Sequence, residues 1–316
     1  MEVFHTPVLL EETIKYLAPR KAGELMIDAT VGEGGHLFAF LSQFPDLKVI
    51  GIDADSEIQK TARERLAPFG DRVQFYTGWS HDFFAEYPAE IRRPDTILMD
   101  LGVSLYHYEK SGRGFSFRYD EPLDMRLDTS SGLSASDLIA RLSEKDLADL
   151  LYTNAEERYS RQIARAIVEA RKSGAITSSA VLAEIIERAV PPAYRHGAIH
   201  PATKTFLALR IAVNGELSRL AGLLEAAFRI LETGGRLGVI SFHSLEDRIV
   251  KNFFRDKNRD CICPPEAPIC KCGGQRAVTI LTRKGVSPGE EEIRKNPPSR
   301  SARFRAAEKI LDEAES

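Results

Sequence analysis

The residues best suited to chemistry form a glycine-rich run at residues 28–36, Asp-Ala-Thr-Val-Gly-Glu-Gly-Gly-His. A short apolar run precedes it, so Gly32 and Gly34 stand where a strand turns into a helix and allow close backbone approach to a ligand. A second apolar run ends at Asp53, a position from which a carboxylate accepts hydrogen bonds from the ribose hydroxyls of an adenosyl group. The pattern indicates a nucleoside-containing ligand, with a simple tight turn as the alternative.

Two ligands suit such a loop, a nicotinamide dinucleotide and S-adenosylmethionine. A dinucleotide site would carry a third fingerprint glycine where this chain has Leu37, and it would hold a pyrophosphate at the helix N-terminus. Asp28 leads the turn, and a carboxylate repels a pyrophosphate but attracts the sulfonium and ammonium groups of S-adenosylmethionine. The acid therefore favours methyl transfer over hydride transfer.

Further candidates end two later apolar runs. Asp100 ends the fourth, where a hydrogen-bond acceptor would orient a substrate amino group that loses a proton on reaction. Capping of the following turn is the alternative. The fifth run ends at Ser241, and residues 244–247 resemble a helix start of the capping-box type. His243 is therefore the catalytic candidate at this end, and Ser241 is a candidate for substrate binding.

The elements that must position these residues follow an α/β rhythm. Strand-length apolar runs occupy residues 25–27, 49–52, 73–76 and 96–99. They are poor in polar residues, as expected of parallel strands covered on both faces. Residues 56–66 between the second and third runs have helical spacing, which predicts a right-handed βαβ unit. An earlier helix is predicted to begin at Thr6 as N-cap, with Pro7 at its first helical position.

The rhythm breaks after Asp100 and returns later. Residues 106–201 contain helical patterns without an apolar strand, which predicts an all-helical insertion. We expect one long helix over residues 202–231, then strands at 237–240 and 278–281, and a loop at 295–298 before a basic C-terminal helix. The predicted division is a discontinuous domain of residues 1–105 and 202–316 with the helical domain at 106–201.

Composition and charge narrow the class of protein and its partners. The 316 residues are 43% hydrophobic and 28% charged, which excludes a disordered, collagenous or membrane chain. No apolar stretch approaches the roughly 18 residues of a membrane span, and no basic leader precedes one, so we expect a cytoplasmic protein. The net charge of -3 conceals fifteen Lys and Arg against seven Asp and Glu in residues 248–309. That segment indicates either an anionic partner or a solvated basic face.

All four cysteines fall between residues 261 and 272. Disulfides are disfavoured in a reducing cytoplasm, and four thiolates on two adjacent loops can form a tetrahedral zinc site. Unliganded thiols in a loop are the alternative, because the spacing is less specific than paired Cys-x-x-Cys. The sequence leaves the metal undecided for its four candidates: Cys261, Cys263, Cys270 and Cys272.

Six motifs in order carry a family resemblance: residues 28–36, 100–104, 113–117, 122–126, 200–203 and 240–248. With them the chain resembles, over essentially its whole length, the bacterial small-subunit ribosomal RNA cytosine-N4 methyltransferases, the MraW or RsmH family. The resemblance implies a Rossmann-like S-adenosylmethionine-dependent methyltransferase fold with an inserted all-helical domain. It further implies methylation of the exocyclic N4 of a cytidine in the decoding region of 16S rRNA, with 16S rRNA or the small ribosomal subunit as partner.

The resemblance also implies roles for single residues of the donor site. Gly34, Gly35 and His36 would lie at the methionine side of the donor. Asp53 would bind the ribose and Asp100 would lie near the methyl group, and Asp28 and Gly32 belong to the same loop. Trp79 matches the aromatic that the family places near adenine. His107 stands where the family commonly has a donor-contacting Gln, which would add pH sensitivity to a side-chain hydrogen bond.

The helical insertion fits an enzyme that must reach the edge of a base. Such enzymes extrude the base and hold it by stacking and hydrogen bonds. Arg113, Phe115 and Arg126 would supply cations and an aromatic face for this, although Phe115 is equally well explained as core. His200 and Lys204 would contact phosphate, and the basic C-terminal segment would supply a sequence-independent grip on RNA.

Two other functions compete with this interpretation. A DNA amino methyltransferase performs similar chemistry, but it would normally carry an Asn/Asp-Pro-Pro-Tyr-like motif, which residues 100–104 lack. A ribosome-assembly factor without turnover would keep the donor pocket, but the presence of Asp28, Asp53 and Asp100 together favours catalysis.

Overall fold

A computed structural model describes residues 6–197, 199–260 and 275–312 of the chain. It divides into two compact units. The first unit comprises Met1–Gly102 and Arg219–Ser316, and the second comprises Val103–Ser218. Among the helices of the described residues, none combines the length and the apolar composition that a membrane span requires.

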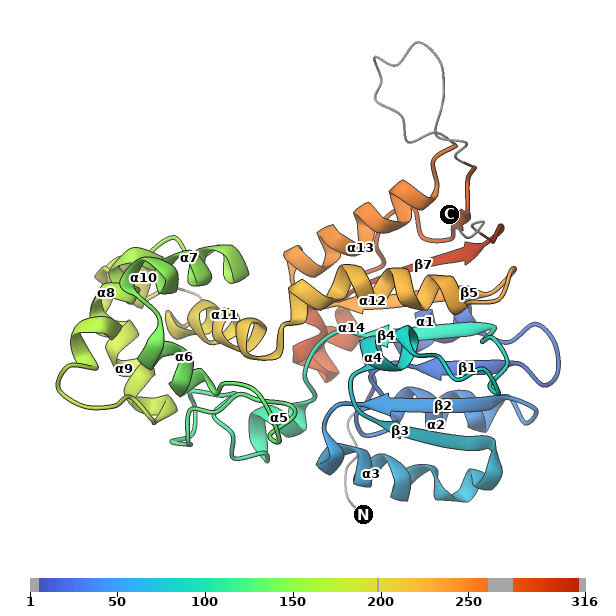
Figure 1. Cartoon of the computed structure of the whole chain (residues 1–316), viewed down its shortest axis with the longest axis horizontal. Coiled ribbons are helices and arrows are strands. Elements are labelled where there is room, and N and C mark those ends of the chain that lie inside the picture. The colour runs from blue at the N-terminus through green and yellow to red at the C-terminus, as the bar shows by residue number, and fades with distance from the viewer. Residues whose placement is uncertain (1–5, 198, 261–274, 313–316) are drawn as a thin grey trace, which may run out of the picture. The chain divides into compact units, whose positions relative to one another are not determined.

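The first unit contains a seven-stranded sheet in the order β3-β2-β1-β4-β5-β7-β6 (Figure 1). Its strands are β1 (Leu25–Asp28), β2 (Lys48–Asp53), β3 (Val73–Thr77), β4 (Thr96–Asp100), β5 (Arg236–Ser241), β6 (Val278–Ile280) and β7 (Arg303–Lys309). The first five strands pair in parallel, and β7 pairs antiparallel with both β5 and β6. The predicted apolar runs are therefore strands of one sheet, although β3 is an edge strand with exposed side chains.

Alternating side chains of the strands pack on helices on both faces of the sheet. In β1, Met26 packs with one cluster, whereas Leu25 and Ile27 pack with the other, as the period of two in a strand requires. The first cluster contains residues of α1 (Leu10–Leu17), α2 (Gly35–Gln43) and α3 (Ser56–Leu66). The second contains residues of α4 (Ser80–Ala85), α12 (Glu216–Ile230) and α13 (Ser244–Lys257). The predicted helix over residues 56–66 is confirmed.

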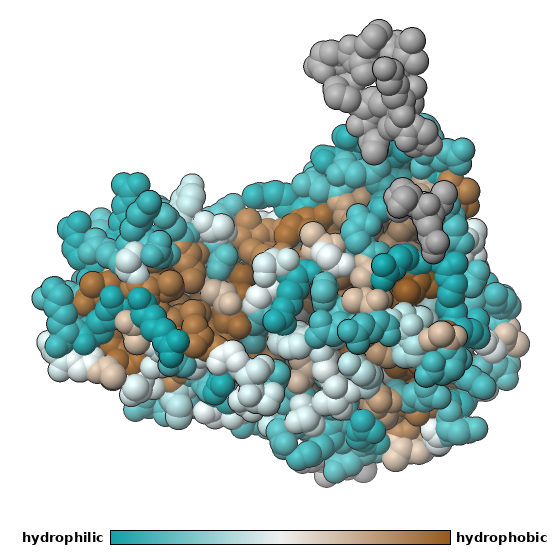
Figure 2. All heavy atoms as spheres, in the orientation of Figure 1, coloured by the Kyte–Doolittle hydropathy of each residue, from teal (hydrophilic) through white to brown (hydrophobic). Residues whose placement is uncertain are grey.

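In the described residues of the second unit the regular elements are helices, apart from one isolated β-bridge between Pro122 and Ser178, and residues 110–134 form a long loop. Its helices are α5 (Leu105–Glu109), α6 (Ala135–Arg141), α7 (Glu144–Ala155), α8 (Ser160–Ala170), α9 (Ser179–Ala189), α10 (Pro192–Arg195) and α11 (Ala202–Asn214). They enclose a core of their own. Figure 2 shows hydrophobic residues between these helices, bordered by hydrophilic ones.

The long helix expected over residues 202–231 is instead two helices. Gly215 has a φ of 61° and ends α11, and α12 begins at Glu216. Arg210 and Glu216 form a bidentate ion pair across this break, with distances of 2.9 and 2.8 Å. α11 packs on α6, α7 and α9, so residues 202–218 belong to the helical unit. The sequence had predicted that they belong to the sheet-containing domain.

The two ends of the first unit also differ from expectation. α1 begins at Leu10 rather than near Pro7, because Leu9 has a φ of 53° and donates its backbone N–H to Glu292 Oε1 at 2.7 Å. The basic helix predicted after Pro298 is wrong. Residues 303–309 form β7, whose Phe304, Ala306 and Ala307 are buried. A short 3-10 helix, η2 (Pro297–Ser301), and the helix α14 (Glu290–Lys295) precede it.

Candidate active site

The candidate residues of the first unit meet at one edge of the sheet. Asp28, Asp53, Asp100 and Ser241 are the last residues of β1, β2, β4 and β5. These strands are parallel, and β1 lies between β2 and β4 while β5 follows β4. The four strand ends therefore lie side by side, which is where open α/β sheets bind ligands.

The glycine-rich loop after β1 needs its glycines for two physical reasons. Gly32 and Gly34 have φ values of 51° and 76°, in the left-handed region that side chains disfavour. A Cβ on Gly35 would stand 2.6 Å from Pro7 Cγ, so only a glycine admits the N-terminal segment there. The loop is thereby held against residues 7 and 8, and α2 begins directly after it.

Asp53 fastens this loop to the end of β2. Its Oδ2 accepts the backbone N–H of Gly32 at 2.8 Å, and its Oδ1 accepts that of Asp55 at 2.9 Å. A carboxylate in this position orders the two loops that follow β1 and β2. A carboxylate oxygen has two lone pairs and can accept a ligand hydroxyl in addition to a backbone N–H.

Asp28 is buried behind the loop. Its Oδ1 accepts the backbone N–H of Thr30 at 3.1 Å. Burial raises the pKa of Asp28 to about 7, and the nearby charge of Asp53 acts in the same direction, whereas the bond from Thr30 acts against it. The hydroxyl of Thr30 accepts the backbone N–H of Asp100 at 2.7 Å, so this threonine links the first loop to β4.

His36 and Asp100 face one another across the site. His36 is buried, its Nε2–H donates to the backbone oxygen of Val8 at 3.1 Å, and burial lowers its pKa to about 4. The ring is therefore neutral, and its Nδ1 is an acceptor that lies 3.8 Å from Asp100 Oδ2. Burial, with Asp28 and Glu246 nearby, raises the pKa of Asp100 to about 8.

His243 serves as the N-cap of α13. Its Nδ1 accepts the backbone N–H of Glu246 at 3.4 Å, and Glu246 Oε2 accepts that of Phe242 at 2.9 Å. The reciprocal pattern resembles a capping box, with histidine in the position usually taken by Ser or Thr. The helix start expected at residues 244–247 is confirmed, but His243 is its cap. Ser241 is buried and donates its hydroxyl to the backbone oxygen of Arg303 at 3.3 Å.

Two buried side-chain atoms of the predicted catalytic pair make no hydrogen bond, Asp100 Oδ1 and His243 Nε2. His243 Nε2 is 3.2 Å from Glu246 Oε1 without the alignment of a hydrogen bond. Unsatisfied buried polar atoms are rare and costly, and they mark positions where a ligand supplies the missing partner. With Asp28 and Asp53 beside it, Asp100 Oδ1 belongs to a set of carboxylate acceptors that fits a cationic ligand. His243 accepts through Nδ1, so its neutral ring carries the proton on Nε2 and offers a donor there.

Trp79 follows β3 and lies at the N-cap of α4. The guanidinium carbon of Arg219 stands 4.3 Å from the centre of its ring. One ring face is thus covered by a cation, and Trp79 is partly exposed. Sequence patterns did not single out Arg219, because its partner comes from an element 140 residues away.

The other predicted site residues belong to the second unit, where each has a structural contact. His107 and Phe115 are buried with ring centres 5.3 Å apart. Arg113 donates to the backbone oxygens of Arg126 and Leu127 at 2.9 and 3.0 Å. Phe115 is core, as its alternative interpretation had it.

Three further candidates of this unit are also bonded. Arg126 forms a bidentate ion pair with Asp124 at 2.8 and 2.7 Å. His200 accepts the backbone N–H of Ala202 at 3.2 Å, and Lys204 donates to the backbone oxygen of Glu156 at 3.0 Å. The roles of these residues toward a substrate stay predictions. The cysteine cluster at residues 261–272 lies outside the described residues.

Thr30 and Glu246 are site residues that the sequence analysis did not assign. Thr30 lies in the glycine-rich motif, and its bond to the backbone of Asp100 needs two strands that are distant in sequence. Glu246 was included only as part of a helix start, although it contacts His243 twice. For both residues, the sequence feature that could have indicated a role in the site was a polar side chain within a motif.

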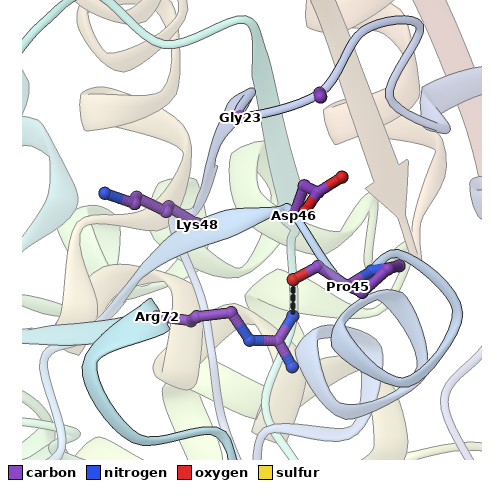
Figure 3. Close-up of a pocket in the computed structure, with 6 residues that line it drawn as sticks. Gly23, Pro45, Asp46, Lys48 and Arg72 are labelled. Carbon is purple, nitrogen blue, oxygen red and sulfur yellow. Dashed lines mark hydrogen bonds between the residues drawn. The ribbon is translucent and has the colours of Figure 1, made fainter.

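The first unit also has a surface pocket, which lies at the opposite edge of the sheet from the candidate site (Figure 3). Gly23 precedes β1 and Lys48 begins β2, so the pocket is at the amino ends of these strands. Arg72 in its wall donates to the backbone oxygens of Phe44 and Pro45, at 3.1 and 2.9 Å. These bonds satisfy carbonyls that follow α2, which is a structural task.

Comparison with known proteins decides the family. The sequence model of the MraW methylase family matches residues 2–310. The chain belongs to this family. The MraW methylase family relative from Treponema denticola, named ribosomal RNA small subunit methyltransferase H, is 57% identical over 98% of both chains. A relative of the same name from Carboxydothermus hydrogenoformans is 46% identical over 98% of this chain and 99% of its own.

Among solved structures, an rRNA methylase from Streptococcus thermophilus covers 98% of this chain and 100% of its own, at 10% identity and a TM-score of 0.42. Membership of the MraW methylase family confirms the resemblance drawn from the six motifs. The chain is an S-adenosylmethionine-dependent rRNA methyltransferase with the predicted Rossmann-like fold and helical insertion.

Proposed function

We propose that this enzyme transfers a methyl group from S-adenosylmethionine to the exocyclic N4 of one cytidine in the decoding region of 16S rRNA. Support comes from the family and from relatives named for the small-subunit RNA. The proposed chemistry depends on one observation: at the end of β4, the buried Oδ1 of Asp100 makes no hydrogen bond. An acceptor there suits an amino group that must be oriented and must lose a proton.

Different residues of the site would bind the methyl donor and orient the cytidine. S-adenosylmethionine, when bound, supplies a methyl group on a positively charged sulfur. Asp28 and Asp100 would hold negative charge beside it, Asp53 would accept ribose hydroxyls, and Gly34, Gly35 and His36 would line its methionine side. Asp100 would accept a hydrogen bond from the N4–H of cytidine and thereby orient the nitrogen. His243 Nε2 offers a second polar contact to the base.

The decisive experiment follows the methyl group. Small subunits lacking this modification, and the 16S rRNA extracted from them, are incubated with the enzyme and methyl-labelled donor, and the RNA is digested to nucleosides. We expect label in N4-methylcytidine. Label in DNA alone would establish the rival amino methyltransferase, and no transfer to either RNA substrate would leave only an assembly factor.

A variant separates binding of the donor from chemistry. Asp100→Ala should reduce methyl transfer more than it weakens donor binding, because the carboxylate acts on the acceptor as well as on the donor. Calorimetry measures the donor affinity and single-turnover assays measure the transfer. An equal loss of both would show that Asp100 is a donor ligand alone.

A further inference from the structure

An aromatic and cationic cluster lies on the second unit, and its central residues have no role in the site described above. It forms at the turn between α7 and α8, where the guanidinium carbon of Arg158 stands 4.9 Å from the Tyr159 ring centre and 4.7 Å from that of Tyr194. The two rings are 4.8 Å apart and inclined at 55°. Arg158 is exposed, while both tyrosines are partly exposed.

A buried carboxylate fixes this arrangement. Glu157 is fully buried, and its Oε2 accepts the hydroxyl of Tyr194 at 2.8 Å. Its Oε1 accepts the backbone N–H of Tyr159, also at 2.8 Å. The turn is further held by Lys204, which donates to the backbone oxygen of Glu156. The rings are thus ordered in advance, which lowers the entropic cost of binding a ligand on them.

Neighbouring residues extend the cluster with the same chemistry. Tyr152, one turn before Glu156 on α7, is 62% exposed. His200, one turn before Lys204, is exposed and stacks on Phe117 with ring centres 4.4 Å apart and an 18° angle. Arg158, Tyr159 and Tyr194 thus form the cluster by direct contact, and α7 and residues 200–204 of the same unit add further accessible aromatic and cationic side chains.

We propose that Arg158, Tyr159, Tyr194 and Lys204, with Tyr152 and His200 beside them, form a binding surface for single-stranded RNA. The proposal rests on the proposed function and assigns a surface for its substrate. Unstacked bases bind by stacking on aromatic rings and on guanidinium planes, and the lysine ammonium attracts phosphates. A buried acid that orders two tyrosines around an exposed arginine supplies such a stacking platform.

The test measures RNA affinity without methyl transfer. Binding of a fluorescent single-stranded RNA with the sequence around the target cytidine is followed by anisotropy in the absence of donor. Arg158→Ala should weaken binding about 10-fold, in line with the loss of one stacked base. Tyr159→Leu should weaken it similarly, whereas Tyr159→Phe should restore it because the ring is kept.

The matched control is Arg165→Ala on α8. Arg165 is 78% exposed and lies 3.4 Å from Glu144, the first residue of α7, whereas the aromatic cluster follows the last turn of that helix. The Arg165→Ala variant removes the same charge as Arg158→Ala, but it should change the RNA affinity by no more than about 2-fold. Arg158→Lys keeps the charge without the planar group and should bind more weakly than the wild type. Circular dichroism and thermal melting identify any variant that fails to fold.

The outcomes separate this surface from the proposed function. Equal affinities of Arg158→Ala and Arg165→Ala, or no rescue by Tyr159→Phe, would overturn the surface while methylation by the wild type still stood. Wild-type protein that binds the RNA through Arg158 yet methylates no cytidine would overturn the function and leave the surface. Retained RNA affinity with loss of binding to a protein partner would assign the cluster to that partner instead.

Discussion

At the scale of single residues, the carboxyl groups of the site are held in an unusual state. Burial raises the pKa of Asp28 to about 7 and that of Asp100 to about 8. Because these folded-state values lie above the ordinary one, the contribution of both groups to stability falls as pH rises from about 4 to about 8. A bound cation favours their ionised forms and offsets this loss.

Binding of the donor should depend on pH through these two carboxyl groups. Affinity for S-adenosylmethionine should rise from pH 6 to about 8 and then level off, by up to about 10-fold per pH unit for each proton released. Calorimetry in buffers of different ionisation enthalpy measures both the affinity and the proton release. Asp100→Asn should flatten the profile, and the demethylated product, with neutral sulfur, should show a shallower one. A profile that Asp100→Asn leaves unchanged would remove Asp100 from this role.

At the scale of elements, the break between α11 and α12 shows what a local pattern omits. The apolar spacing of residues 202–231 is continuous enough to predict one helix, but Gly215 adopts the left-handed conformation. Asn214 Nδ2 donates to the backbone oxygen of Met125 at 2.8 Å, and its Oδ1 accepts the backbone N–H of Leu127 at 2.9 Å. These contacts with a distant loop hold the chain where the helix ends.

The break gives a prediction whose sign depends on the structure. In a continuous helix, Gly215→Ala would stabilise the protein by about 1 kcal/mol. With a φ of 61°, the same change should destabilise it by about 1 to 2 kcal/mol. Urea unfolding measures the difference. Gly174→Ala, at a position without a left-handed φ and with open space around it, is the control and should change stability little.

At the scale of the whole molecule, the uneven charge of the chain takes on a different meaning. The basic segment of residues 248–309 suggested a grip on phosphate, but several of its cations have partners within the first unit. Arg305 forms a bidentate ion pair with Asp247 at 2.6 and 3.0 Å, and Lys257 lies 2.9 Å from Glu225. The charge that can meet RNA is therefore smaller than the count of residues.

Lys309 makes this distinction testable. Its side chain is 2% exposed, and its Nζ donates to the backbone oxygens of Phe228 and Leu231 at 3.0 and 2.8 Å. Lys309→Met should cost about 2 to 4 kcal/mol of stability, since it leaves buried carbonyls unpaired, and should not change the salt dependence of RNA binding. Denaturant unfolding and salt titrations check both. A stable variant with a shallower salt dependence would instead place Lys309 at the RNA. Lys251→Met, exposed on α13, should leave stability nearly unchanged.

The α/β rhythm, the strand-end carboxylates, the helical insertion and the family could all be predicted from the amino-acid sequence. Those features depend on local periodicity and on residue types within short motifs, so they are visible without a fold. Asp28, Asp53 and Asp100 could be placed at one edge because parallel strands end at the same side of a sheet.

The features that depend on partners distant in sequence became visible only in the folded chain. The C-terminal residues 303–309 are rich in charge and look helical, but they form the strand β7, which pairs antiparallel with both β5 and β6. Thr30 acts on Asp100, and Val8 sets the protonated nitrogen of His36, through hydrogen bonds across the fold. Local propensity carries no information about such bonds, since their energy exists only once separate segments have been brought together.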